Sequence, residues 1–266
     1  PDVSAGTHAK ITTGTADNKF GVPAADAPAF YAEAATLPGL AVQGITVHIG
    51  SQLTTLEPLE QAFRRLGELI AALRGQGHDI RTADLGGGLG VPHGPGQPEP
   101  PTPEVYGDMV RRVTADWNTR LLFEPGRLIV GNAGVLLTRV VRVKPGVRDP
   151  WLIVDAGMND LMRPALYDAY HRIEAVRPSG ERQTVNVVGP VCETGDTFTM
   201  GREMDRVEAG DLILFRTSGA YGATLSNGYN SRPLAAEVMV DGDRWALIRR
   251  RVDPDVLAGV GVAEWQ

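Results

Sequence analysis

This chain of 266 residues has one cysteine, three lysines and no long uninterrupted hydrophobic run. A single cysteine cannot form an intrachain disulfide, which excludes the disulfide-rich secreted proteins. No apolar stretch approaches the length of a membrane span, and the first residues (PDVSAGTHAK) lack the apolar core of a signal peptide. We therefore expect a cytoplasmic protein that does not enter a membrane.

An excess of positive charge is also missing. The chain has 26 Lys and Arg against 32 Asp and Glu, a net charge of -6, and a pI near 5.4. It has no basic run that could follow a phosphate backbone, so nucleic acid is excluded as a partner. His48, His78, His93 and His171 show none of the close spacings that zinc sites use, and we predict no metal site.

What the sequence does contain is enough hydrophobic residues, 42%, to form the core of one large or two ordinary domains. In the first half, predicted strands alternate with amphipathic helices. The strands end at His48, Asp84 and Glu124, which lie 36 and 40 residues apart, and this is the period of β/α units with a parallel sheet. The predicted elements are strands at 41–47, 80–85 and 121–123 and helices at 57–74 and 104–117.

The pattern changes after residue 134, where short β-rich runs are separated by Gly, Pro and Asp turns. These runs lie at 135–143, 151–154, 184–188, 211–215, 234–240 and 245–250, with one short helix expected near 160–170. The fold class predicted is α/β: a partial (β/α)8 TIM-type barrel at 1–134, followed by a mostly antiparallel β domain, barrel or sandwich, at 135–266. Three or four β/α units cannot close an eight-stranded barrel, so we expect its C-terminal half.

Cys192 lies in Gly189–Asp196 (GPVCETGD), beside a carboxylate and among turn-forming residues. A reactive thiol needs such a polar, partly exposed loop, whereas an inert cysteine usually lies within an apolar run. Most single cysteines are inert all the same, so the position alone leaves both interpretations open.

Glycine and charge follow two of the predicted strands. Gly86, Gly87 and Gly88 come directly after one strand, where they let the backbone approach an anion such as a phosphate. The motif lacks the lysine of a P-loop, and a tight turn without a ligand remains an alternative. The next strand ends at Glu124-Pro-Gly-Arg127, where the N–H groups of Gly126 and Arg127 could complete a phosphate site.

Other polar residues are candidates with plain alternatives. His48 could be a strand-end histidine satisfied by backbone, and Ser51 could be an ordinary loop serine. Arg163 and Tyr167 are four apart and would share a helix face that could hold a carboxylate or form a surface salt bridge. Tyr221, between small residues in GAYG, suits close ligand approach or a β-bulge.

Taken in order, the segments HIGSQ, DLGGGLG, EPGR, MNDLMRPALY, GPVCETGD and GAYG closely resemble the diaminopimelate decarboxylases, pyridoxal-phosphate enzymes of the alanine-racemase-like barrel class. The resemblance covers essentially the whole chain. Ornithine and arginine decarboxylases share HxGS, GGG and EPGR, while CETGD and the Arg163–Tyr167 helix point to the diaminopimelate enzymes.

This resemblance implies a carboxy-lyase of lysine biosynthesis that converts meso-2,6-diaminopimelate to L-lysine and CO2. It also implies a homodimer with active sites shared between subunits, in which Cys192 from the neighbouring subunit protonates the carbanion. Cofactor-binding residues would be His48, Ser51, Gly86, Gly87, Gly88, Glu124, Gly126, Arg127 and Tyr221, with Glu124 facing the pyridine nitrogen and His48 the ring face. Substrate-binding residues would be Arg127, Arg163, Tyr167, Glu193 and Tyr221.

One departure concerns lysine. The family bonds its cofactor to a lysine on the first barrel strand, and Lys10, Lys19 and Lys144 do not fit that segment. We therefore expect this chain to be the C-terminal part of a longer enzyme and to be inactive alone. Two alternatives remain open: a decarboxylase of another basic amino acid, such as ornithine or arginine, and a non-catalytic relative that serves as a binding or regulatory subunit.

Overall fold

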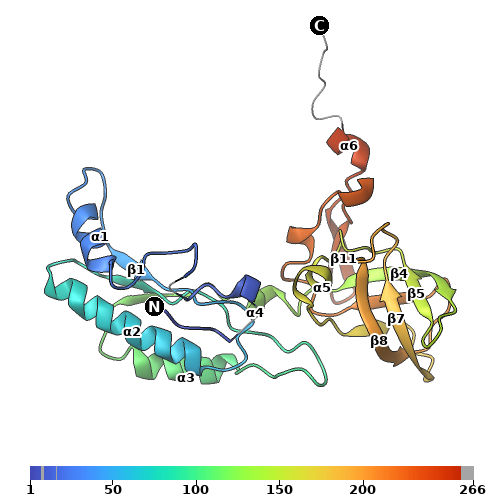
Figure 1. Ribbon diagram of the computed structural model, residues 1–266, viewed down its shortest axis with the longest axis horizontal. Coiled ribbons are helices and arrows are strands. Elements are labelled where there is room, and N and C mark those ends of the chain that lie inside the picture. Colours follow the sequence, from blue (N-terminus) through green and yellow to red (C-terminus); the bar gives the residue numbers. More distant parts are fainter. Residues whose placement is uncertain (7–8, 16, 259–266) are drawn as a thin grey trace, which may run out of the picture. The chain divides into compact units, whose positions relative to one another are not determined.

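The computed structural model describes residues 1–6, 9–15 and 17–258. It divides into two compact units, Pro1–Val130 and Gly131–Gln266, and the division lies shortly before the boundary predicted at residue 134 (Figure 1). The identities predicted for the two parts, half a cofactor-binding barrel and a C-terminal domain, stay predictions. Within the described residues, no helix is both long and apolar enough to cross a membrane.

The first unit is built on a parallel sheet of β1 (Gly44–Thr46), β2 (Thr82–Asp84) and β3 (Arg120–Leu122), in that order. The register aligns Thr46 with Asp84 and Asp84 with Leu122, so the three strands end level with one another. The observed strands are shorter than predicted but centred on the same segments. Three parallel strands are an open sheet, and their membership of an eight-stranded barrel stays a prediction.

Two helices share the hydrophobic core with this sheet, α2 (Glu57–Gly75) and α3 (Pro103–Val113). The apolar spacing predicted for α2 is confirmed: Leu59, Phe63, Leu66, Ile70 and Leu73 are buried in the core of the unit, and Leu69 packs against it. Helix α3 begins where the Thr102 hydroxyl accepts from the Val105 amide, and it ends at Val113, four residues before the predicted end. Three further helical segments belong to this unit: η1 (Ala9–Ile11), α1 (Ala27–Ala34) and α4 (Gly126–Val130).

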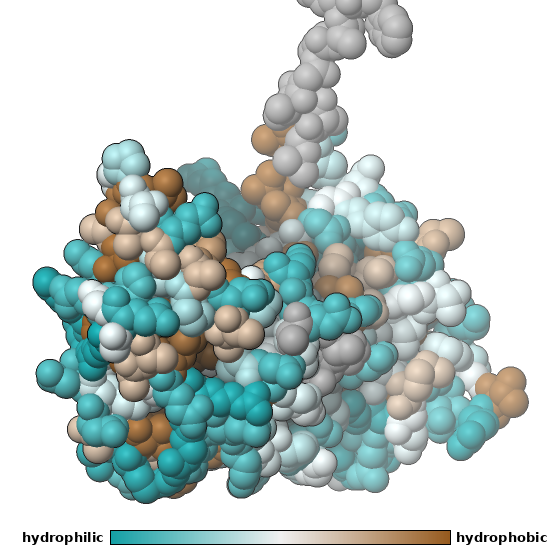
Figure 2. All heavy atoms as spheres, turned by 60° about the vertical axis from the view of Figure 1, so that its left-hand side comes forward, coloured by the Kyte–Doolittle hydropathy of each residue, from teal (hydrophilic) through white to brown (hydrophobic). Residues whose placement is uncertain are grey.

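Exposed apolar side chains interrupt the hydrophilic surface of the first unit, brown among teal in Figure 2. Five of them lie on α1 and the segments beside it: Phe20, Val22, Phe30, Leu37 and Leu40.

The second unit contains a six-stranded sheet in the order β6-β9-β4-β5-β7-β8 and a separate hairpin, β10-β11. All pairs are antiparallel except β5 with β7, which agrees with the predicted mostly antiparallel domain. The strands are β4 (Leu136–Lys144), β5 (Trp151–Val154), β6 (Ile173–Ala175), β7 (Arg182–Val188), β8 (Thr197–Asp205), β9 (Leu212–Phe215), β10 (Glu237–Asp241) and β11 (Arg244–Arg249).

The helices of the second unit are short: α5 (Arg163–Tyr167), η2 (Ala223–Leu225), η3 (Tyr229–Ser231) and α6 (Pro254–Ala258). Helix α5 occupies the middle of the helix predicted near 160–170. Strands β6 and β8 were not predicted, although β8 is one of the longest in the unit. The segments that carry Cys192 and Tyr221 are loops beside this sheet.

Candidate active-site residues in the two units

The glycine turn after β2 lies between the chain ends of its two neighbours. The Leu85 amide donates to the Leu122 carbonyl at 3.0 Å, and the Glu124 amide donates to the Gly86 carbonyl at 2.8 Å. A Cβ at Gly86 would meet the Val47 carbonyl, and one at Gly87 would meet the Glu124 carbonyl, both closer than 3.0 Å. These are backbone obstacles that cannot rotate away, so the turn accepts no side chain.

Gly88 is confined in the same way. Its φ of +102° lies in the left-handed half of conformational space, and a Cβ there would overlap the Gly50 carbonyl. Of the three glycine amides, Gly86 donates to Asp84 Oδ1 at 2.9 Å and Gly87 donates to His48 Nδ1 at 3.3 Å. Among the described residues, the Gly88 amide has no protein acceptor, which makes it the donor of this turn that could serve a ligand.

His48 is exposed, and its ring is oriented by the glycine turn. Because its Nδ1 accepts from the Gly87 amide, the neutral ring carries its proton on Nε2. The prediction placed His48 at the end of a strand. In the structure, β1 ends at Thr46 and His48 lies two residues further along the chain. The structure therefore brings His48 and the glycine turn into direct contact.

Arg127 contacts the loop that follows β1. The residue is 7% exposed, and Nη2 donates to Ser51 Oγ at 3.1 Å. A serine hydroxyl that accepts one hydrogen bond still has its own hydrogen to donate to a ligand. Ser51 and Arg127, predicted from separate motifs, thus form one polar pair.

The Gly126 amide lies in a tight turn, and its use in binding a phosphate stays a prediction. This N–H donates to the Glu124 carbonyl at 2.8 Å, because the chain turns sharply into α4 at Pro125. The same turn leaves the Glu124 side chain exposed while its backbone is held on both sides. The motif thus marks a turn at the end of β3, as the sequence predicted.

In the second unit, Arg163 opens α5 and is 4% exposed. Its Nη1 lies 2.9 Å from His171 Nε2, and His171 Nδ1 lies 2.8 Å from the Arg216 carbonyl. A buried guanidinium requires such a partner, since an uncompensated charge in the interior is costly. Tyr167, at the other end of the helix, is half-buried.

The loop that carries Cys192 is folded around Asp196. The Asp196 carboxylate is 2% exposed and accepts from the Val191 amide at 2.7 Å and the Met158 amide at 2.6 Å. Burial raises the pKa of Asp196, while the two hydrogen bonds act in the opposite direction. Cys192 itself is exposed, as the polar setting of the motif predicted.

Glu193, next to Cys192, has a partner that the sequence did not reveal. The Tyr229 hydroxyl donates to Glu193 Oε2 at 2.8 Å. Tyr229 follows an Asn-Gly turn in a segment rich in Ser, Gly and Asn, which indicated only a loop. Nothing in the local pattern could have paired it with a residue 36 positions earlier.

Tyr221 has a φ of +60°, which is rare for a residue with a side chain, and the residue is 48% exposed. Gly222 is required beside it, because a Cβ there would overlap the Ser218 carbonyl. A strained, exposed tyrosine is a feature of ligand sites.

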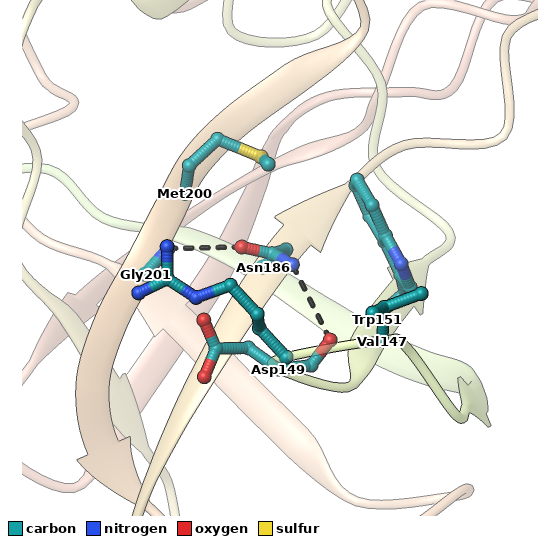
Figure 3. A pocket seen from close by; sticks show the side chains of 7 residues that line it. Val147, Asp149, Trp151, Asn186, Met200 and Gly201 are labelled. Atoms are coloured by element: carbon teal, nitrogen blue, oxygen red, sulfur yellow. Dashed lines mark hydrogen bonds between the residues drawn. The ribbon is translucent and has the colours of Figure 1, made fainter.

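A hollow of about 450 Å³ lies elsewhere on the second unit, and none of the predicted residues lines it (Figure 3). Asn186 holds its wall together, since its Oδ1 accepts from the Gly201 amide at 2.9 Å and its Nδ2 donates to the Asp149 carbonyl at 3.4 Å. The lining residues are Val147, Arg148, Asp149, Trp151, Asn186, Met200 and Gly201.

Comparison with known families gives a match to the sequence model described as "Pyridoxal-dependent decarboxylase, C-terminal sheet domain", over residues 15–219. The chain is 54% identical to the diaminopimelate decarboxylase of Zymomonas mobilis, over all of this chain and 63% of that protein. It is 50% identical to the diaminopimelate decarboxylase of Neisseria meningitidis serogroup A, over 94% of this chain and 61% of the relative.

Solved structures of diaminopimelate decarboxylases also match the chain. The diaminopimelate decarboxylase of Helicobacter pylori in complex with L-lysine matches with a TM-score of 0.91 and 36% identity, over 97% of this chain and 64% of that one. The enzyme of M. jannaschii in complex with L-lysine matches with a TM-score of 0.91 and 35% identity, over 99% of this chain and 62% of that one. The chain thus spans less than two thirds of the length of these relatives.

Proposed function

The chain belongs to the pyridoxal-dependent decarboxylase family, and we propose that, as part of a longer enzyme, it converts meso-2,6-diaminopimelate to L-lysine and CO2. The observation that carries this proposal is the glycine turn, in which three neighbouring backbones exclude every side chain and one amide is left for an anion. The choice of substrate rests on the identity of 54% over the whole chain to a diaminopimelate decarboxylase.

The first unit fits the phosphate and the ring of pyridoxal phosphate. The Gly88 amide, the Ser51 hydroxyl and the backbone of Arg127 would hold the phosphate, with Gly86 and Gly87 shaping the turn. The exposed ring of His48 would stack on the pyridine, and the exposed carboxylate of Glu124 would face the ring nitrogen. When bound, the cofactor supplies an electron sink for the loss of CO2, and a carboxylate at its nitrogen strengthens that sink.

The second unit offers groups for an amino acid that is charged at both ends. Arg163 and Tyr167, together with Arg127 of the first unit, would bind the distal carboxylate, and Glu193 would accept from the distal ammonium group. Tyr221 would contact both cofactor and substrate. The Cys192 thiol would then donate its proton to the carbon that has lost CO2, and its exposure leaves it accessible for that role.

A substrate panel on the complete enzyme tests the substrate. We expect release of CO2 from meso-diaminopimelate and much less from ornithine or arginine, because a clamp built for two charged ends loses several kcal/mol when one end is missing. Faster turnover of ornithine or arginine would favour the other basic amino acid decarboxylases. No turnover of any of them would favour a non-catalytic binding or regulatory subunit.

The role of Cys192 has its own test. Cys192→Ala in the complete enzyme should lower turnover while leaving cofactor binding, followed by the absorbance of the bound pyridoxal, nearly intact. Equal turnover in the variant would remove Cys192 from the mechanism.

We further propose a homodimer in which Cys192 completes the site of the neighbouring subunit. Mixing the impaired variants Arg127→Ala and Cys192→Ala in equal amounts should then raise activity above that of either variant alone, by about a quarter of the activity of the unchanged enzyme, because half of the dimers are mixed and each has one intact site. No restoration in a mixture shown to exchange subunits would place the thiol and the cofactor site in one subunit.

A further inference from the structure

Glu193 is held by a tyrosine from another loop. Its Oε2 accepts from the Tyr229 hydroxyl at 2.8 Å, and because Gly195 has no side chain, the space beside Oε1 stays open. An exposed glutamate normally samples several rotamers, and this hydrogen bond favours one of them.

Tyr229 is itself held in place by its own loop. Its amide donates to Asn227 Oδ1 at 3.0 Å, and the next two residues, Asn230 and Ser231, have φ of 58° and 54°. Two consecutive left-handed residues other than glycine are unfavourable and persist only where other contacts fix the backbone.

Arg232 supplies those contacts directly after the strained pair. Its Nε donates to Asn159 Oδ1 at 2.8 Å, and its Nη2 donates to the Asp155 carbonyl at 2.5 Å and to Asp160 Oδ2 at 3.3 Å. The guanidinium therefore fixes the end of the Tyr229 loop with three hydrogen bonds.

The Tyr229 loop and the Cys192 loop share one support. The Asn227 amide donates to the Asn159 carbonyl at 3.0 Å, and the neighbouring Met158 amide donates to the Asp196 carboxylate at 2.6 Å. Both loops are thus attached to the segment 158–159, so the hydrogen bond between Tyr229 and Glu193 joins two loops that share one anchor.

We propose that Tyr229 is a positioning residue that orients the Glu193 carboxylate toward the distal ammonium group of the substrate. This inference rests on the proposed function for the identity of the ligand. A carboxylate that already accepts from Tyr229 on Oε2 has Oε1 left for the ammonium group, which fixes the position at which an amine is recognised.

The first experiment needs only this chain. The hydrogen bond to Glu193, followed by the charge of Glu193, by burial and by the charge of Cys192, raises the pKa of Tyr229 above its ordinary value of 10.0. In NMR titrations of chain labelled at tyrosine Cζ, Tyr229 should ionise at higher pH in the unchanged chain than in Glu193→Gln, with its signal identified by loss in Tyr229→Phe. Ionisation at the same pH in both chains would overturn the proposal.

The second experiment uses the complete enzyme. Tyr229→Phe keeps the ring and removes the hydroxyl, and we expect KM for meso-diaminopimelate to rise about tenfold with kcat nearly unchanged. Tyr170→Phe is the matched control, because this ring packs under Arg202 at 4.2 Å in the same unit, and it should leave both constants unchanged.

A double variant separates positioning from general loosening of the loop. If Tyr229 acts through Glu193, then Tyr229→Phe should raise KM no further in a Glu193→Gln background. Full additivity of the two effects, or an unchanged KM in Tyr229→Phe, would overturn the proposal. An enzyme inactive on meso-diaminopimelate would refute the proposed function instead, while the titration still decides whether Tyr229 and Glu193 are coupled.

Discussion

The Arg163 guanidinium lies 2.9 Å from His171 Nε2, and both side chains are at least 96% buried. Arginine can only donate, so His171 Nε2 must accept, and the imidazole proton lies on Nδ1, which donates to the Arg216 carbonyl at 2.8 Å. A neutral histidine thus connects α5 to the end of β9 and orients an arginine proposed to bind substrate.

Replacing His171 should destabilise the second unit. His171→Ala removes the acceptor of a buried guanidinium, so we expect the free energy of unfolding to fall by about 1–3 kcal/mol in urea titrations. Arg216→Ala is the control, because the carbonyl that His171 uses belongs to the backbone and the Arg216 side chain forms only an exposed ion pair with Glu174. Equal loss in the two variants would argue against the buried pair.

Gly87→Ala should disrupt the glycine turn. The new Cβ would overlap the Glu124 carbonyl, so the two strand ends must separate, and we expect a loss of stability of about 1–3 kcal/mol. Gly107→Ala adds the same methyl group inside α3, where nothing lies within 4 Å, and should raise stability by about 0.5–1 kcal/mol. Thermal unfolding of both variants decides between these opposite signs.

Asp196→Ala should release the Cys192 loop. The change leaves the Val191 and Met158 amides without their acceptor, at a cost of about 1–3 kcal/mol. Because Cys192 is the only cysteine of the chain, the rate of its alkylation by iodoacetamide reports on this loop alone. We expect that rate to change in Asp196→Ala and to stay constant in Glu181→Ala, an exposed carboxylate that pairs with Arg206. An unchanged alkylation rate would show that Asp196 does not control the loop.

A carboxylate between helices α2 and α3 should make stability depend on acid pH. Hydrogen bonds from Arg112 and Arg64 lower the pKa of Glu60 from 4.5 to about 2. The folded state therefore binds this proton more weakly than the unfolded state, and the stabilisation is present above about pH 4.5 and is lost as pH falls toward 2. The interaction of Glu60 with these two arginines is partly exposed and contributes about 0.5 kcal/mol. The free energy of unfolding of Glu60→Gln should therefore be lower than that of the unchanged chain at pH 7, and the two should be nearly equal near pH 2.

The fold could be predicted where the residue pattern of a single segment is enough to indicate its secondary structure. Helix α2 matches its prediction because the apolar residues from Leu59 to Leu73 recur at helical spacing and form one continuous buried stripe. Strand β8 was missed because Gly201, with φ of +59°, and the charged Arg202 and Glu203 interrupt its pattern. Pairing with β7, which includes irregular register, makes this segment a strand.

The family, the division into two parts and the positions of the glycine turn and the Cys192 loop follow from the amino-acid sequence alone, because each depends on residues that are close together in the chain. The contacts between these segments appear only in the folded molecule. The Gly126 amide donates to the Glu124 carbonyl, Ser51 pairs with Arg127, and Tyr229 donates to Glu193. These contacts join residues far apart in sequence, and their geometry arises from the packing of several segments at once, which no local pattern of residues encodes.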